Sequence, residues 1–271
     1  MYLCTMNFND EAAAGRNNKR KIKIGAVSYL NSKPLIYGLE KGMMKDEAEL
    51  LIDYPSNIAK ALLEDSIDIG LVPVAIIPEL KEHHIITDYC ISADGAVESV
   101  CLFSDVPIDK IETVMLDYQS RTSVLLVQIL LKEYWKKAVV FEKAHEDFID
   151  HIKGATAAVV IGDRTFEQRK ISAYCYDLGF AWKQHSGLPF VFAAWISNKQ
   201  MSEAFIQSFN KANESGLQHL DTVIEKYKTD KTDLETYYTK FIQYRFTKEK
   251  KEGLKLFLKK CSELEDALAE A

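Results

Sequence analysis

The fold of this chain is decided by residues 24–37, Ile-Gly-Ala-Val-Ser-Tyr-Leu-Asn-Ser-Lys-Pro-Leu-Ile-Tyr. A short apolar strand is followed by Ser28, Tyr29 and Asn31, and Pro34 then opens a helical pattern. Uncharged hydrogen-bonding groups therefore stand at the end of a strand and beside a helix N-terminus, where open α/β folds bind small anionic ligands. Because the stretch has no glycine-rich phosphate loop and no metal-ligand pair, it predicts a site for a small organic acid.

Strand and helix patterns alternate outward from this stretch. The expected strands cover residues 21–27, 49–54, 67–72, 89–93, 97–103, 113–116, 138–142, 157–161, 174–178 and 190–196. The expected helices cover residues 34–41, 58–65, 124–135, 145–151, 203–219, 234–244 and 248–271. Ser56 is a plausible N-cap of the second helix, and Asp94-Gly95 is typical of a hairpin turn.

This order predicts an α/β, doubly wound arrangement in two lobes with a ligand cleft between them. We expect residues 1–20 to form a flexible leader before the first strand. Lobe 1 is expected to combine residues 21–105 with 200–271, so that the C-terminal helices cover it, and lobe 2 to span residues 106–199.

Composition narrows the class of function. The 271 residues are 47% hydrophobic, and the formal net charge is −6. This charge argues against nucleic acid as a partner, and an anionic ligand must be attracted by a local site. No apolar run is long enough to span a membrane, and the N-terminus lacks the apolar core of a signal peptide.

The five cysteines are odd in number, widely spaced and without zinc-site spacing. We expect reduced thiols in a cytoplasmic protein, with Cys90 and Cys101 in the core. His145 and His151 are six positions apart, which places them on different faces of a helix, so no metal site is expected there. Oligomeric state is left open, with a homodimer as one candidate.

Seven short motifs, in this order, resemble the chorismate dehydratase family of the futalosine route to menaquinone. They are Val27-Ser28-Tyr29-Leu30-Asn31 with Pro34-Leu35; Tyr54-Pro55-Ser56; Asp68-Ile69-Gly70-Leu71-Val72-Pro73; Asp94-Gly95 with Val97 and Ser99-Val100; Ser120-Arg121-Thr122-Ser123; Ile161-Gly162-Asp163; and Asp177-Leu178-Gly179 with Trp182 and Gly187-Leu188-Pro189-Phe190. Val74 and Gln119 depart from the small polar residues more usual in the family.

The resemblance implies a type II periplasmic-binding-protein fold and a cofactor-free lyase. Chorismate would lose water to give 3-[(1-carboxyvinyl)oxy]benzoate. Asn31 and Ser99 are the candidates for the catalytic centre, because an amide and a hydroxyl can stabilise a developing oxyanion without adding negative charge. No motif offers an obvious His or Lys base, so we hypothesise that the substrate's own enolpyruvyl carboxylate takes the proton.

The remaining candidates bind substrate. Ser120, Arg121 and Thr122 stand at an expected helix N-terminus, which is a natural carboxylate cradle. Ser28 and Tyr29 are candidates for a second cradle. Asp163 follows a buried strand and could orient the substrate hydroxyl, and Gly95 completes the set of candidates: Ser28, Tyr29, Gly95, Ser120, Arg121, Thr122 and Asp163.

Each candidate also has a purely structural interpretation. Asn31 could shape the turn before its helix, Ser99 could be a core residue, and Ser120 and Asp163 could be N-caps. Arg121 could pair with an acid across the lobes. Trp182 and Trp195 are more typical of core residues than of stacking platforms.

The sequence is also compatible with two other functions. One is the related 1,4-dihydroxy-6-naphthoate synthase, a family that should place a histidine in the cleft. The other is a non-catalytic protein of the same fold that binds a small carboxylate.

Overall fold

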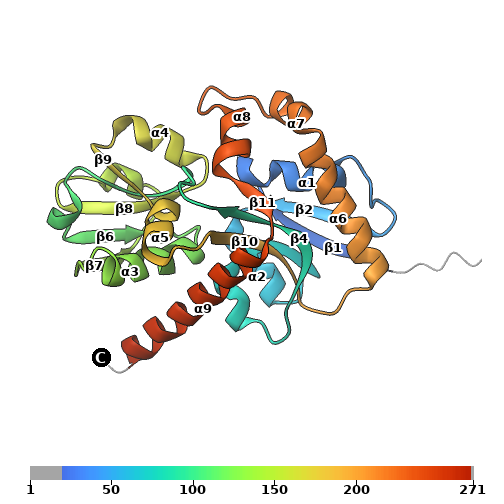
Figure 1. Ribbon diagram of the computed structural model, residues 1–271, viewed down its shortest axis with the longest axis horizontal. Helices are drawn as coiled ribbons and strands as arrows, with labels where there is room; N and C mark the ends of the chain where they lie inside the picture. The colour runs from blue at the N-terminus through green and yellow to red at the C-terminus, as the bar shows by residue number, and fades with distance from the viewer. Residues whose placement is uncertain (1–19, 270–271) are drawn as a thin grey trace, which may run out of the picture.

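Two β-sheets, each covered by helices, make up the two lobes of the computed structural model, which describes residues 20–269 and the side chains of residues 20–267 (Figure 1). Apart from Arg20, the expected leader lies outside the described residues. The sheet of lobe 1 has the strand order β11-β4-β10-β3-β1-β2. Its strands are β1 (Ile22–Val27), β2 (Ala48–Asp53), β3 (Ile69–Pro73), β4 (His84–Ala93), β10 (Phe190–Ser197) and β11 (Gln243–Arg245).

The sheet of lobe 2 has the order β7-β6-β8-β5-β9. Its strands are β5 (Val100–Ser104), β6 (Thr113–Leu116), β7 (Val140–Lys143), β8 (Thr156–Ile161) and β9 (Tyr174–Asp177). In each sheet, parallel pairs (β1 with β2 and β3, β6 with β7 and β8) are combined with antiparallel strands.

The helices follow mostly from local signals. Those of lobe 1 are α1 (Lys33–Glu40), α2 (Pro55–Leu63), α6 (Glu203–Gln218), α7 (Leu220–Lys226), α8 (Leu234–Thr236) and α9 (Lys248–Ala269), with 3₁₀ turns η1 (Leu30–Ser32) and η2 (Val74–Glu79) and a π-helical turn η5 (Tyr237–Phe241). Those of lobe 2 are α3 (Thr122–Glu133), α4 (Arg164–Ile171) and α5 (Leu178–Ser186), with 3₁₀ turns η3 (Ile108–Lys110) and η4 (Phe148–His151). Asp177 caps α5 by accepting from the Phe180 N–H, and Gly187 ends it in the left-handed conformation.

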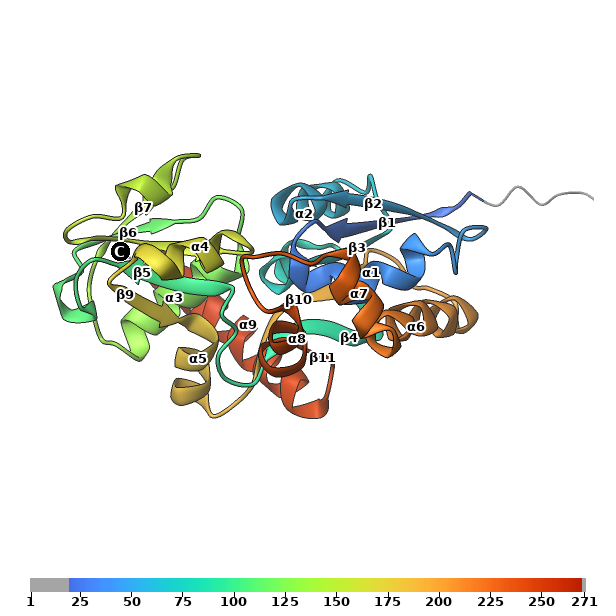
Figure 2. The ribbon, with the colours of Figure 1, turned by 90° about the horizontal axis from the view of Figure 1, so that it is seen from above.

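The C-terminal helices return to lobe 1, as expected. Helix α6 packs so closely on α1 that a Cβ on Gly216 would lie 1.8 Å from the Pro34 carbonyl oxygen. Helix α9 contacts both β10 and α3, so it runs along both lobes (Figure 1). Seen from above, β11 lies near the junction of the lobes, where it pairs with β4 (Figure 2).

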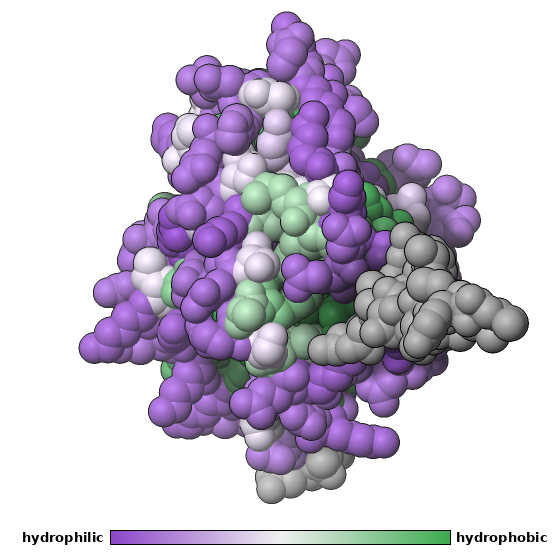
Figure 3. Space-filling view, turned by 90° about the vertical axis from the view of Figure 1, so that its right-hand side faces the viewer, coloured by the Kyte–Doolittle hydropathy of each residue, from purple (hydrophilic) through white to green (hydrophobic). Residues whose placement is uncertain are grey.

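Apolar side chains fill the interior of both lobes, including the expected core residues Cys90, Cys101, Trp182 and Trp195, all fully buried. At the end of the molecule far from lobe 2, polar side chains cover most of the surface around a central apolar area (Figure 3). This distribution is the ordinary consequence of burying apolar surface.

Three expectations about chain course were wrong. Asp94-Gly95 is not a hairpin turn, because β4 lies in the sheet of lobe 1 and β5 in that of lobe 2. Strand β5 was expected in lobe 1 and β10 in lobe 2, and the sheets place each in the other lobe. The chain therefore crosses between lobes after β4 and again before β10, where local sequence patterns carry no signal of sheet membership.

Smaller differences concern individual elements. The expected helix over residues 234–244 is a short helix and π-turn followed by β11, which pairs with the edge of β4. Helices α4, α5 and α7 were not expected as separate elements. Ser56 lies inside α2, whose N-cap is Tyr54, so it is not a cap.

Candidate active site

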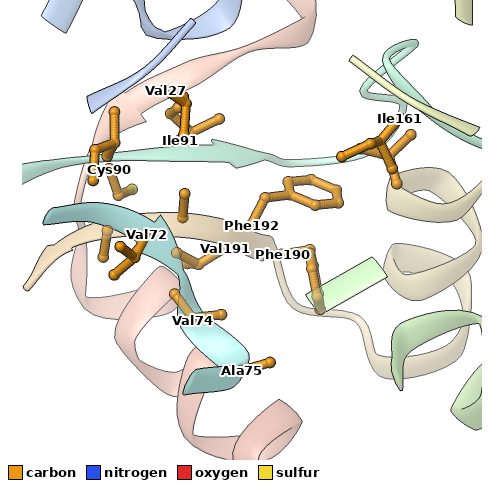
Figure 4. Packing of buried hydrophobic residues seen from close by; sticks show 14 of the residues in the cluster. Val27, Val72, Val74, Ala75, Cys90, Ile91, Ile161, Phe190, Val191 and Phe192 are labelled. Carbon is orange, nitrogen blue, oxygen red and sulfur yellow. The ribbon is translucent and has the colours of Figure 1, made fainter. Parts of the chain in front are cut away.

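A small cavity of about 60 Å³ lies between the lobes. Lobe 1 and the crossover after it supply Val27, Tyr29, Asn31, Pro55, Pro73, Ile91, Ser99, Phe192 and Ala193, and lobe 2 supplies Val100, Gln119, Ser120, Thr122, Ser123, Ile161 and Gly162. The Phe192 ring extends from β10 toward Ile161 at the end of β8, so apolar side chains of both lobes approach each other here (Figure 4). A larger groove of about 610 Å³ between β4, α6 and α9 contains none of the expected site residues.

Asn31 lies in η1, directly after β1, and lines the cavity. Its backbone carbonyl accepts a hydrogen bond from Tyr244 Oη at 3.0 Å. Its side-chain Oδ1 is buried and has no hydrogen-bond partner among the described residues. An unpaired buried acceptor costs free energy, and this one remains available to a donor in the cavity.

Ser99 is fully buried and lines the same cavity. Its Oγ accepts a hydrogen bond of 2.7 Å from Tyr237 Oη. The preceding residue, Glu98, has a positive φ of 63°, an uncommon conformation for a residue other than glycine. Asp177 holds this turn by accepting hydrogen bonds from the Val97 and Glu98 N–H groups, so the position of Ser99 is determined by several contacts.

Tyr29 extends across the cavity from lobe 1 to lobe 2. Its hydroxyl donates to Gln119 Oε1. Its ring lies against Gly162, where a Cβ would come within 2.8 Å of two ring carbons. Burial raises the pKa of the Tyr29 hydroxyl far above its ordinary value, so it remains protonated and a donor at neutral pH.

The N-terminus of α3 forms the wall of the cavity that belongs to lobe 2. Ser120 Oγ accepts from the Ser123 N–H at 2.9 Å, so Ser120 serves as a local cap while it lines the cavity. Thr122 Oγ1 accepts from the Ala75 N–H of lobe 1 at 3.2 Å. Ser120, Thr122 and Ser123 all line the cavity, so the first turn of this helix faces it.

Four expected binding residues do not line the cavity. Arg121 turns away and forms a two-oxygen ion pair with Glu79 of lobe 1 at 2.6 and 2.7 Å, which is the structural alternative foreseen for it. Asp163 Oδ1 accepts from the Leu30 N–H at 3.2 Å, and burial raises the pKa of its carboxyl. The Ser28 N–H donates to the Asp53 carbonyl, and Gly95 lies in the crossover beside Gly179.

These contacts join the lobes in a closed arrangement. Tyr29 with Gln119, Leu30 with Asp163, Ala75 with Thr122 and Glu79 with Arg121 all connect lobe 1 to lobe 2. A cavity of about 60 Å³ holds only a few water molecules, whereas ligand sites usually measure about 300–1,000 Å³. The lobes must therefore separate before an organic acid can enter.

Two supporting residues were missed from the sequence. Asp117, at the end of β6, is fully buried and accepts from the N–H groups of Gln119 and Ile161, both of which line the cavity. Arg164 pairs with it at 2.5 Å. The available signal was an aspartate directly after a buried strand. Burial raises the pKa of the Asp117 carboxyl, and the guanidinium opposes that rise.

Among the described residues, no cluster of three or more His, Cys, Asp or Glu side chains is arranged to hold a metal ion. Within the same part of the chain, no helix is both long and apolar enough to cross a membrane.

Comparison with solved structures places this architecture among known folds. A protein of Archaeoglobus fulgidus matches with a TM-score of 0.73 and 14% identity, over 94% of this chain and 100% of that one. The periplasmic aliphatic sulphonate binding protein of Escherichia coli matches with a TM-score of 0.59 and 13% identity, over 92% and 88%. The expected two-lobe, periplasmic-binding-protein-like fold is thus confirmed.

Two curated relatives, both named chorismate dehydratase, are similar over most of the chain. The Thermus thermophilus protein is 25% identical over 226 residues, which are 76% of this chain and 81% of the relative. The Campylobacter jejuni protein is 23% identical over 248 residues, 89% of this chain and 97% of the relative. A family model described as menaquinone biosynthesis matches residues 22–263. This match covers most of the chain, and the protein therefore belongs to the menaquinone biosynthesis family.

Proposed function

We propose that this chain is a chorismate dehydratase, a hydro-lyase that converts chorismate to 3-[(1-carboxyvinyl)oxy]benzoate and water in the futalosine route to menaquinone. The observation that carries the proposal is that Asn31 and Ser99, distant in sequence, line one cavity in which the Asn31 amide oxygen is unpaired. The two relatives named for this activity, aligned over most of their length, support it.

The unpaired acceptor suits this substrate. The chorismate dianion carries one O–H group, the hydroxyl that leaves as water. Asn31 Oδ1 can accept from that hydroxyl and orient it, while Ser99 donates to negative charge on the substrate. Tyr29, Ser120 and Thr122 contribute the other hydroxyl groups around the cavity.

The reaction breaks a C–H bond and a C–O bond, and it forms one ring double bond and one O–H bond of water. The proton leaves the ring carbon that bears the enolpyruvyl ether, and its electron pair enters the ring. The C–O bond to the neighbouring hydroxyl then breaks, and the hydroxyl takes a proton and leaves as water. The ring carboxylate accepts negative charge as the proton leaves, so donors around it lower the barrier.

We infer that the enolpyruvyl carboxylate of the substrate is the base. Of the described residues that line the cavity, none is a histidine, lysine or carboxylate. A rate governed by the substrate's own carboxylate should not vary with the pKa of a protein histidine or lysine. A pH–rate profile with an inflection between pH 6 and 8 that disappears on substitution of a protein residue would contradict this step.

We propose that the lobe boundaries lie at the two crossovers, at residues 94–99 and 187–189. We also propose a cytoplasmic location, which is supported by the unpaired thiols of the four cysteines that the structure describes. A homodimer remains a prediction, to be tested by light scattering on the purified chain.

The deciding experiment mixes the purified protein with chorismate, without added metal or nucleotide, and follows products by liquid chromatography with mass detection. We expect the loss of one water and the appearance of the aromatic enolpyruvyl ether. Binding of chorismate by calorimetry without turnover would instead identify a binding protein. Unchanged and unbound chorismate would refute the proposal and direct attention to the related naphthoate synthase.

A further inference from the structure

Three tyrosine hydroxyls from the C-terminal segment lie directly behind the two proposed catalytic residues. Tyr237 Oη donates to Ser99 Oγ at 2.7 Å, Tyr238 Oη to the Leu30 carbonyl at 3.0 Å, and Tyr244 Oη to the Asn31 carbonyl at 3.0 Å. All three side chains are buried. None of them lines the cavity, so they can act on a substrate only through the residues that they hold.

The hydrogen bond from Tyr237 determines what the Ser99 hydroxyl can do. A serine hydroxyl has one hydrogen and two lone pairs. Because Tyr237 supplies a hydrogen to Ser99 Oγ, the serine hydrogen remains to be donated. The other acceptor near Ser99 Oγ is the Val97 carbonyl at 3.5 Å, too long for a strong bond. The serine hydrogen is therefore available to a group in the cavity.

Tyr237 can serve as a constant donor to Ser99 because its protonation and its ring orientation are both fixed. Burial raises the pKa of its hydroxyl well above the ordinary value, so it remains a donor at neutral pH. Its ring packs edge-on against Phe166 of α4, with ring centroids 5.2 Å apart. It also belongs to the π-helical turn η5, a local irregularity that often occurs at functional sites.

We infer that Tyr237 is a positioning residue that fixes the Ser99 hydroxyl as a donor toward the substrate, while Tyr238 and Tyr244 hold the turn that carries Asn31. This inference rests on the proposed function and extends it to the C-terminal segment. Two hydrogen bonds in series polarise each other, so the tyrosine also strengthens the donation by Ser99.

The test removes one hydroxyl at a time. Tyr237→Phe keeps the buried ring and loses only the hydrogen bond, so kcat for chorismate should fall about 3- to 10-fold while KM stays within about twofold. Tyr227→Phe is the matched control, because its hydroxyl bonds to Glu40 on α1 away from the cavity. This control should keep the wild-type kcat.

A double-mutant cycle separates positioning from a general structural effect. In the Ser99→Ala background, Tyr237→Phe should cause no further loss of kcat, since the hydroxyl that it orients is absent. An equal fold-loss with and without Ser99 would overturn the inference, as would a Tyr237→Phe variant of the active enzyme with full kcat. A wild-type protein that leaves chorismate unchanged would overturn the proposed function first, and the inference with it.

Discussion

Asn31 offers the sharpest prediction, because its replacement should lower turnover without lowering the stability of the fold. Its Oδ1 is buried and unpaired, which costs the folded protein about 1–3 kcal/mol. Asn31→Ala removes that cost together with some packing. We therefore expect the free energy of unfolding to stay within about 1 kcal/mol of the wild-type value or to rise. Loss of a group that acts on the reacting atoms should lower kcat by about 100- to 1,000-fold.

Asn213 provides a matched control of the same residue type. It is fully buried, its Oδ1 accepts from Trp195 Nε1 at 2.7 Å, and its Nδ2 donates to the Phe209 carbonyl at 2.8 Å. Asn213→Ala leaves the tryptophan N–H buried without an acceptor, which should cost about 1–3 kcal/mol of stability. Because this site lies away from the cavity, kcat should be unchanged.

The two variants are compared by urea denaturation followed by circular dichroism and by turnover of chorismate. We expect Asn31→Ala to lose turnover and keep its stability, and Asn213→Ala to lose stability and keep its turnover. If Asn31→Ala lost as much stability as Asn213→Ala and kept most of its turnover, Asn31 would be a structural residue and its assignment to catalysis would be wrong.

Three further predictions use other contacts between the lobes. Gly162→Ala and Gly154→Ala both place a side chain at a positive φ, 67° and 59°, at a cost of about 1–2 kcal/mol each, but only the Cβ at residue 162 meets a neighbour within 4 Å. Urea denaturation should therefore show the larger loss of stability for Gly162→Ala, and only this variant should lower turnover; equal effects would contradict the contact with Tyr29. Burial raises the pKa of Asp163, so the folded state binds its proton more tightly than the unfolded state and loses stability as pH rises through that pKa. Asp163→Asn should therefore raise Tm above the wild-type value at pH 7, and this gain in Tm should vanish below about pH 3.9, the pKa of an aspartate in the unfolded chain; a gain in Tm that does not vary with pH would contradict the raised pKa. Glu79→Gln weakens a partly exposed ion pair with Arg121 that is worth at most about 1 kcal/mol, so KM should rise by less than about fivefold while kcat is retained. The rise in KM should be smaller in 1 M salt, and a loss of kcat in steady-state assays would mean that this pair does more than close the lobes.

The fold was predictable where its determinants are local. Strand β3 is a continuous apolar run that ends at Pro73, β1 is apolar apart from Lys23, and Pro34 lies in the first turn of α1. Sheet membership was not predictable in the same way, because it depends on where the chain crosses between lobes. Strands β5 and β10 have the apolar character of buried strands in either sheet, and their partners are distant in sequence.

Site prediction had the same limit. Asn31 follows β1, Ser99 directly precedes β5, and Ser120 and Thr122 stand at the start of α3. They meet at one cavity because these strand ends and this helix start converge between the lobes. Tyr237 has no such signal. Its segment has helical periodicity, yet the chain forms a π-turn there and then β11, which pairs with β4. Only tertiary packing brings the Tyr237 hydroxyl to Ser99.

The cavity is proposed to bind a dianion, yet none of the described residues that line it carries a charge. Two arginines stand close in sequence to residues that line the cavity, but both are already paired: Arg121 with Glu79 and Arg164 with Asp117. Binding must then rely on hydroxyls, the Asn31 amide and the N-terminus of α3. A strong fixed cation would stabilise bound chorismate and its transition state alike, which does not raise kcat. Hydrogen bonds from neutral donors gain strength as negative charge develops on the substrate, so an uncharged site of this kind would favour the transition state over the substrate.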